Sequence, residues 1–142
     1  MVETLKLGLA TEVLASFGQA LLPVTGSSMF PRMQPGDLLE IRSPSHPIRT
    51  GEVVVFLLHA RLVVHRVVSR TGDLYITRGD RRRFPDAPVH AAAILGYVTA
   101  IERRGRRISP RFTLLCHIGS SVLRRTEFGT RVALYFARMV RT

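Results

Sequence analysis

Cysteine and tryptophan are nearly missing from this chain of 142 residues, which contains Cys116 alone and no tryptophan. A single cysteine cannot form an internal disulfide, so a disulfide-stapled miniprotein is excluded and the fold must rely on a hydrophobic core. Hydrophobic residues make up 46% of the chain and charged residues 22%, which is typical of a globular protein and not of a disordered one. The length predicts about one domain.

Long hydrophobic runs are also missing. The longest uncharged stretch, residues 13–31, is interrupted by Gln19, Pro23 and Gly26, whereas a membrane-spanning helix needs about 20 mainly apolar residues. The N-terminus has neither a basic first segment nor a clear apolar segment after it, so we expect no cleaved signal peptide. These absences predict a cytoplasmic or peripherally membrane-associated protein without a transmembrane helix.

Lysine is scarce as well, since Lys6 is the only one among 21 basic side chains. Residues 1–102 are nearly balanced in charge, whereas residues 103–142 carry ten arginines against Glu127, so most of the net charge of +11 lies in the C-terminal part. Such a tail attracts phosphate groups on an acidic membrane or a nucleic acid. It has few aromatic residues for base stacking, so we expect peripheral membrane contact and no specific nucleic-acid binding.

No pattern for a metal ion or a nucleotide is present. The histidines are scattered and lack the spacing of metal ligands; they are His46, His59, His65, His90 and His117. No glycine-rich phosphate-binding loop occurs either. The sequence therefore predicts no metal and no cofactor.

The apolar pattern predicts a mainly β fold with a helical leader. Residues 4–22 repeat apolar side chains at helical spacing, which favours an amphipathic helix. Short β-rich runs separated by Gly, Pro, Asp and Ser follow at residues 38–41, 52–58, 61–68, 74–79 and 93–102. We expect a helical leader at residues 1–23, an antiparallel β domain at residues 24–102 and a basic, partly helical tail at residues 103–142.

Two adjacent serines, Ser27 and Ser28, stand in the stretch "VTGSSMFPRMQPGD" at residues 24–37. A serine hydroxyl becomes a good nucleophile only with a base within hydrogen-bond reach. Lys6 lies in the expected leader, away from the β domain, and arginine stays protonated, so the histidines remain. His65 in "LVVHRVV" is the best placed because strand alternation fixes its side chain on one face. The alternative is a partly buried strand histidine bonded to the backbone.

A histidine base also needs a carboxylate that fixes its tautomer and stabilises the imidazolium. The stretch "ITRGDRRRFPDAPV" supplies Asp80 and Asp86, and each of them can instead be a turn aspartate. We take Asp80 as the first choice to orient His65 and keep Asp86 as the other candidate.

The order of "GSSMFPRMQPGD", "GEVVVF", "LVVHRVV", "ITRGD" and "ILGYV" resembles the type I signal peptidase and LexA-type superfamily of serine peptidases, over residues 24–102. The resemblance implies a coiled, mostly antiparallel β domain with Ser28, the serine directly before methionine, as the nucleophile. His65 matches the Ser-His branch of the endoplasmic reticulum, archaea and spore formers, where other members have lysine. The family acidic positions correspond to Asp80 and Asp86.

The resemblance also implies residues that bind the oxyanion and shape the substrate pocket. The backbone N–H of Ser28 is one expected donor. Family members often have a second serine two residues before the nucleophile, where this chain has Gly26, so Ser27 or Thr25 is left for that role. The expected oxyanion and pocket residues are Ser27, Met29 and Pro31, with Met29 at the pocket floor and Pro31 at the exit of the turn.

These observations favour a serine endopeptidase that cleaves leader or signal peptides through an acyl-enzyme. The membrane anchor usual in signal peptidases and the helix-turn-helix domain of LexA-type repressors are not seen, which favours a small stand-alone peptidase. Two alternatives stay open. One is a non-catalytic β module that docks on an acidic membrane or nucleic acid through its arginine-rich tail, and the other is a degenerate homologue that binds peptides without cutting them.

Overall fold

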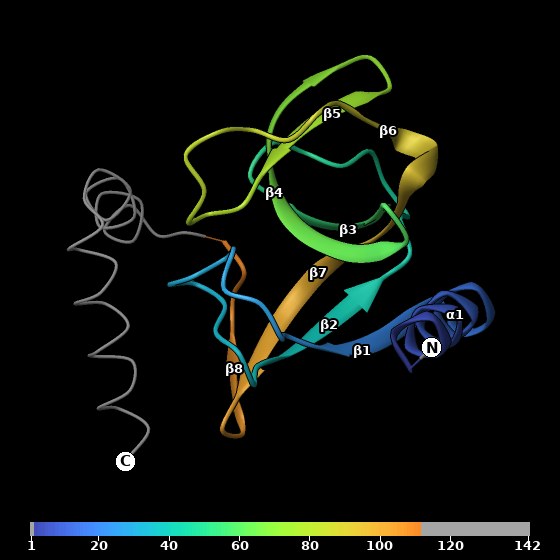
Figure 1. Cartoon of the computed structure of the whole chain (residues 1–142), viewed down its shortest axis with the longest axis vertical. Helices are drawn as coiled ribbons and strands as arrows, with labels where there is room; N and C mark the ends of the chain where they lie inside the picture. The colour runs from blue at the N-terminus through green and yellow to red at the C-terminus, as the bar shows by residue number, and fades with distance from the viewer. Residues whose placement is uncertain (1, 112–142) are drawn as a thin grey trace.

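The described part of the chain is built on an eight-stranded antiparallel sheet (Figure 1). The computed structural model describes residues 2–111, with side chains from residue 8 onward. Its elements are α1 (Val2–Phe17), β1 (Gln19–Pro23), β2 (Leu38–Arg42), β3 (Val53–Leu58), β4 (Arg61–Thr71), β5 (Leu74–Arg78), β6 (Val89–His90), a 3₁₀ turn (Ala91–Ala93), β7 (Ile94–Arg103) and β8 (Arg106–Ile108). The mainly β fold class with an N-terminal helix is confirmed, and the five expected β-rich runs correspond to β2, β3, β4, β5 and β7.

The expected helix over residues 4–22 is too long, because its last part is a strand. α1 ends at Phe17, since Gly18 adopts a left-handed conformation with φ of 70° and its N–H donates to the carbonyl of Leu14 at 2.9 Å. β1 then pairs antiparallel with β2, so the sheet begins inside the expected leader. Leu21, a member of the expected helical stripe, lies exposed on β1.

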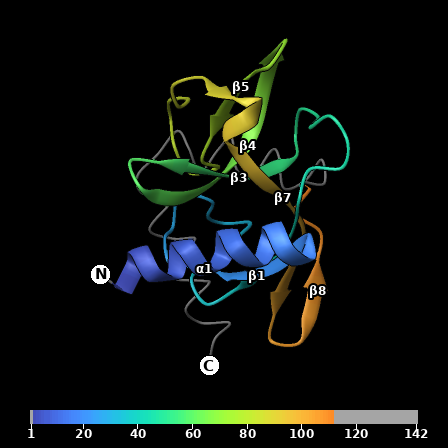
Figure 2. The ribbon, with the colours of Figure 1, turned by 90° about the vertical axis from the view of Figure 1, so that its right-hand side faces the viewer.

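α1 lies along one side of the molecule and has most of its contacts with β1 (Figure 2). Of the apolar side chains that define the expected stripe, Leu14 is buried in the core, whereas Leu9 and Phe17 are exposed. Among the described side chains of α1, Leu14 therefore anchors the helix to the core.

The strands follow the order β1-β2-β7-β3-β4-β5-β6, and β8 pairs with β7. β7 pairs with three strands, with β2 along one edge and with β3 and β8 along the other. The register shifts once in each of the β2–β7, β3–β7 and β4–β5 pairs. Bulges of this kind bend a strand and increase its twist, which accounts for the coiled form of the sheet in Figure 1.

Two hydrophobic clusters share β3 between them. Val53 and Val55 pack in the first cluster, and Val54 and Phe56 pack in the second, so both faces of β3 are buried. This burial explains why the sequence of β3 is continuously apolar instead of alternating. Since a residue directly opposite on an antiparallel partner shares the same face, the pairing of Val54 with His65 places this histidine on the side of the second cluster.

The expected basic tail does not begin at residue 103 as a separate unit. Arg103 ends β7, and β8 folds back on it to complete the sheet. The tail from residue 112 onward, with Cys116, His117 and the expected helical stripe, lies outside the described residues. Within residues 2–111, no helix has the length and apolar character that a membrane crossing requires.

Gly96 in β7 is a position where the fold requires the absence of a side chain. A methyl group added there would lie 2.7 Å from both the carbonyl oxygen of Arg42 and Cγ2 of Ile41. We expect Gly96→Ala to lower the free energy of unfolding by about 1–3 kcal/mol, because backbone and core must move apart. Urea denaturation measures the change.

Gly26→Ala is the matched control, since a methyl group there meets nothing within 4 Å. Its effect on the free energy of unfolding should stay within about 0.5 kcal/mol. Equal unfolding midpoints for the two variants would contradict the close packing of β7 against β2.

Candidate active site

Ser28 lies in the turn between β1 and β2. The turn is held by hydrogen bonds from the Phe30 N–H to the Ser27 carbonyl at 3.1 Å and from the Met33 N–H to the Met29 carbonyl at 3.0 Å. The side chains of Met29, Phe30 and Met33 are buried, whereas Ser28 is half-buried. The apolar neighbours therefore anchor the turn, while Ser28 itself stays partly exposed.

His65 lies in the middle of β4 and is 5% exposed. Its ring packs edge-on against Phe56, with 6.3 Å between ring centroids and 73° between planes. Its Nε2 atom is 3.2 Å from the Oγ of Ser28. The structure thus brings together the two residues that the sequence selects as nucleophile and base.

Asp86 completes this arrangement on the other side of the imidazole. Its Oδ2 lies 2.5 Å from Nδ1 of His65 and also accepts a hydrogen bond from the hydroxyl of Thr77 at 2.7 Å. The backbone N–H of Asp86 donates to the carbonyl of Thr77 at 2.8 Å. A carboxylate fixed in this way keeps the Nδ1 proton of His65 in place.

The first choice of Asp80 as the orienter of His65 is wrong in this geometry. Both Asp80 oxygens accept hydrogen bonds from the guanidinium of Arg66 at 2.9 Å, and Arg66 also donates to the Gly51 carbonyl at 2.8 Å. Asp80 and Arg66 are 4% and 9% exposed, so each buried charge has its counter-charge. Adjacent strand residues point to opposite faces, which is why His65 and Arg66 meet different aspartates.

Gly79, between β5 and Asp80, allows the loop to approach the nucleophile. A methyl group there would lie 2.8 Å from the carbonyl oxygen of Ser28 and 3.1 Å from Nε2 of His65. The Arg81 N–H also donates to that same carbonyl at 2.8 Å. The loop after β5 is therefore packed directly against the serine turn.

The three expected oxyanion and pocket residues have different surroundings. The Ser27 hydroxyl accepts a hydrogen bond from the Arg81 guanidinium at 3.0 Å. Met29 belongs to the first core cluster, and its sulfur accepts the Asp80 N–H at 3.4 Å. Pro31 follows a cis peptide bond and is half-buried. Ser27 and Met29 thus both contact the loop after β5, Ser27 through its hydroxyl and Met29 through its buried sulfur.

Sequence reasoning misses Thr77, which is fully buried and supports Asp86. A usable signal is the alternation along β5, where Tyr75 and Thr77 share the buried face. A hydroxyl at such a position requires a hydrogen-bond partner. That requirement points to a nearby acceptor such as an aspartate of the following loop.

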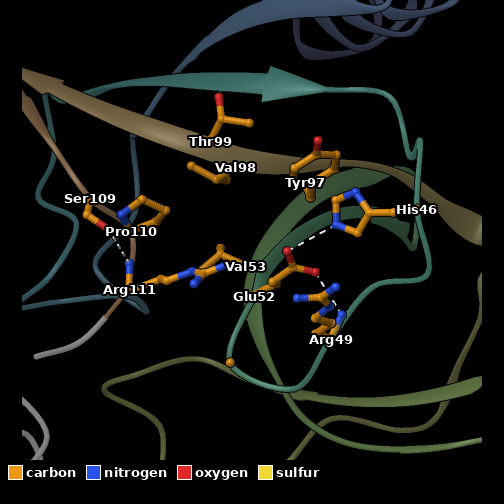
Figure 3. A pocket seen from close by; sticks show the side chains of 11 residues that line it. His46, Arg49, Glu52, Val53, Tyr97, Val98, Thr99, Ser109, Pro110 and Arg111 are labelled. Atoms are coloured by element: carbon orange, nitrogen blue, oxygen red, sulfur yellow. Dashed lines mark hydrogen bonds and ion pairs between the residues drawn. The ribbon is translucent and has the colours of Figure 1, made fainter. Parts of the chain in front are cut away.

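The other described histidines lie away from Ser28. His46 pairs with Glu52 at 3.1 Å, His90 accepts the Ala92 N–H at 3.1 Å, and His59 occupies the β3–β4 turn. His46 and Glu52 line a cavity of about 360 Å³ together with Tyr97 (Figure 3), and neither Ser28 nor His65 lines it.

The Ser28–His65–Asp86 geometry supports one direction of proton transfer. With Nδ1–H donated to Asp86, the Nε2 lone pair of His65 faces the Ser28 hydroxyl and can accept its proton. This is the chemistry of a base-activated serine nucleophile. Within residues 2–111, no group of three or more histidine, cysteine, aspartate and glutamate side chains gathers as metal ligands would.

A comparison with protein families agrees with the fold. The family model described as Peptidase S24-like matches residues 5–99. This range includes Ser28, His65 and Asp86. A search of curated proteins finds no significant match.

The two aspartates should differ sharply when each is changed to asparagine. We expect Asp86→Asn to slow the reaction of Ser28 with a serine-directed acylating probe by up to about 10⁴-fold, because His65 loses the acceptor that sets its tautomer. We expect Asp80→Asn to lower the free energy of unfolding by about 3–5 kcal/mol, because the buried guanidinium of Arg66 loses the negative charge of Asp80.

Probe-labelling rates and denaturation curves of both variants measure these effects. If Asp80→Asn slows labelling while Asp86→Asn only destabilises the fold, the assignment of the two carboxylates is reversed.

Proposed function

Because this chain belongs to the Peptidase S24-like family, we propose that it is a serine endopeptidase of the Ser-His type, with a signal-peptidase-like activity. The observation that carries the proposal is the continuous contact from Ser28 Oγ to His65 Nε2, at 3.2 Å, and from His65 Nδ1 to Asp86 Oδ2, at 2.5 Å. Nucleophile, base and orienting carboxylate come from three separate segments, which favours a reactive site over a structural hydrogen bond.

In the first half-reaction, Ser28 Oγ forms a bond to the carbonyl carbon of the scissile peptide. Its proton moves to Nε2 of His65, and Asp86 stabilises the resulting imidazolium. The tetrahedral intermediate then collapses, the carbon–nitrogen bond breaks and His65 donates its proton to the leaving amine. The acyl group remains on Ser28 as an ester.

The second half-reaction restores the enzyme. A water molecule attacks the ester carbonyl and gives a proton to Nε2 of His65, which passes it to Ser28 Oγ as the carboxylate product leaves. The imidazole is 5% exposed and packs against Phe56. This burial restricts the ring to the orientation that both half-reactions need.

The oxyanion of both intermediates is stabilised by the backbone N–H of Ser28 in this proposal. Among the described residues, no protein group accepts a hydrogen bond from that N–H, so it is available to the substrate. The hydroxyl of Ser27 is the candidate second donor, since its oxygen already accepts from Arg81 and its proton remains for another acceptor. One such donor contributes roughly 10²–10³ in rate.

We assign an extended peptide as the substrate, cut next to small residues as in leader or signal segments. This assignment rests on the order of the sequence boxes around Ser28, His65 and Asp80, which is similar to that of signal peptidases. The Ser28 side chain in a half-buried turn beside the sheet is compatible with a chain segment passing over it.

Replacement of the nucleophile provides the direct test of the proposal. We expect Ser28→Ala to abolish labelling by a serine-directed acylating probe and to lower peptide cleavage by about 10⁴-fold or more, because Ser28 supplies the one hydroxyl that contacts Nε2 of His65 within residues 2–111. Mass spectrometry of the labelled protein should locate the adduct on the peptide that contains residue 28.

Ser45→Ala is the matched control, because Ser45 is exposed in the loop after β2. It should be labelled at the wild-type rate. Cleavage and labelling that persist in Ser28→Ala would refute the proposed function.

A further inference from the structure

The loop between β5 and β6 carries three consecutive arginines, Arg81, Arg82 and Arg83, between the two aspartates of the site. It lies beside the turn that holds Ser28 (Figure 1), and the hydrogen bond from the Arg81 N–H to the Ser28 carbonyl joins them directly at 2.8 Å. Its arginines are thus next to the place where the scissile bond must lie.

The carboxylates and the guanidinium groups of this loop face opposite directions. Asp80 points inward to Arg66, and Asp86 points inward to His65, whereas all three arginines are exposed. Among the described residues, none of these arginines forms an ion pair with a carboxylate. Three positive charges therefore face solvent, and no carboxylate of the described residues neutralises them.

Arg81 and Arg82 lie close to the reacting atoms, and Arg83 follows them on the loop. The Arg81 guanidinium donates to the Ser27 hydroxyl at 3.0 Å. The position that a Gly79 methyl group would take is 3.1 Å from Cγ of Arg82 and equally 3.1 Å from Nε2 of His65. The Arg83 guanidinium lies 5.5 Å from the centroid of the exposed Phe84 ring.

We infer that Arg81, Arg82 and Arg83 form a cationic selection loop, which favours peptide substrates that carry an aspartate or glutamate within a few residues of the scissile bond. This inference rests on the proposed peptidase function, since it names the substrate class of the same site. Arginine suits the task because its planar fork binds a carboxylate in a bidentate way.

The loop is assigned to a peptide and not to a lipid surface because of its attachment to the catalytic turn. A patch that only attracts a membrane has no need for a guanidinium bonded to the residue before the nucleophile. A positive surface beside a reactive group raises the local concentration of an acidic ligand by about tenfold or more, and salt weakens this attraction steeply.

A peptide library derived from a whole proteome tests the inference, because it presents acidic, neutral and basic sequences to the same enzyme. The full chain is incubated with the library at about 50 mM and at about 1 M NaCl, salt levels at which charge screening differs severalfold in range. Cut sites are then identified by mass spectrometry. We expect acidic residues to be enriched several-fold near the cut sites at low salt, and this enrichment to fall at high salt.

Two charge variants link the preference to the loop. R82Q/R83Q should lose the acidic enrichment, and R82E/R83E should replace it with an enrichment of lysine and arginine. R124Q/R125Q is the matched control, because it removes the same charge from the C-terminal part and should keep the acidic preference. Circular dichroism of each variant checks that the fold is retained.

Cleavage of the library without any acidic enrichment overturns this inference and leaves the proposed function intact. Failure of wild type to cut the library, together with absence of Ser28 labelling, overturns both. If R82Q/R83Q keeps the cut-site preference but loses binding to vesicles of phosphatidylserine and phosphatidylcholine, the loop is a lipid contact and the inference is wrong. A preference lost equally in R124Q/R125Q assigns it to the C-terminal arginines and also overturns the inference.

Discussion

The contact between His65 and Asp86 is the interaction on which the site depends. It joins the middle of β4 to the loop after β5, and it leaves Nε2 of His65 free to face Ser28. If the imidazole turned over, Nδ1 would no longer be held and the nucleophile would lose its base. The buried hydroxyl of Thr77 and the ring of Phe56 prevent this by fixing the carboxylate and the imidazole from two further sides.

The two aspartates of one short loop perform separate tasks because β4 presents two side chains in succession. Arg66 forms an ion pair with Asp80 and thereby fixes the start of the loop on the sheet. His65 forms a hydrogen bond with Asp86 at the far end of the loop. With both carboxylates facing inward, the arginines between them are exposed at the rim of the site. A single loop therefore provides the orienting group, the structural ion pair and the charge that we propose for substrate selection.

Much of this arrangement could be predicted from the sequence, because it depends on strand periodicity and on the order of short motifs. The β-branched run around His65 predicts a strand, and the scarcity of lysine leaves histidine as the base. The choice between Asp80 and Asp86 could not be made in this way. It depends on which face of β4 each aspartate meets, and this is set by the pairing of β4 with β5 and by the register shift between Val67 and Ser69.

The end of α1 could not be placed from periodicity either, since the apolar residues after Gly18 fit both a helix and a strand. The left-handed conformation of Gly18 and the pairing of β1 with β2 decide for the strand. The role of Thr77 could not be predicted either, because a threonine inside a strand does not indicate a role in the site until its hydrogen-bond partner is known. What sequence reasoning lacks in each case is a contact between segments far apart in the chain.

Nuclear magnetic resonance of the imidazole nitrogens of His65 is the measurement that tests the central claim most directly. Long-range proton–nitrogen correlation of the neutral ring should show the proton on Nδ1, hydrogen-bonded to Asp86, in the wild-type protein. In the spectrum of Asp86→Asn, the signals of this tautomer should be lost, because the asparagine amide can present its N–H₂ group to Nδ1 of His65. A proton found on Nε2 of neutral His65 in the wild type would contradict the account, since that nitrogen could then not accept the proton of Ser28.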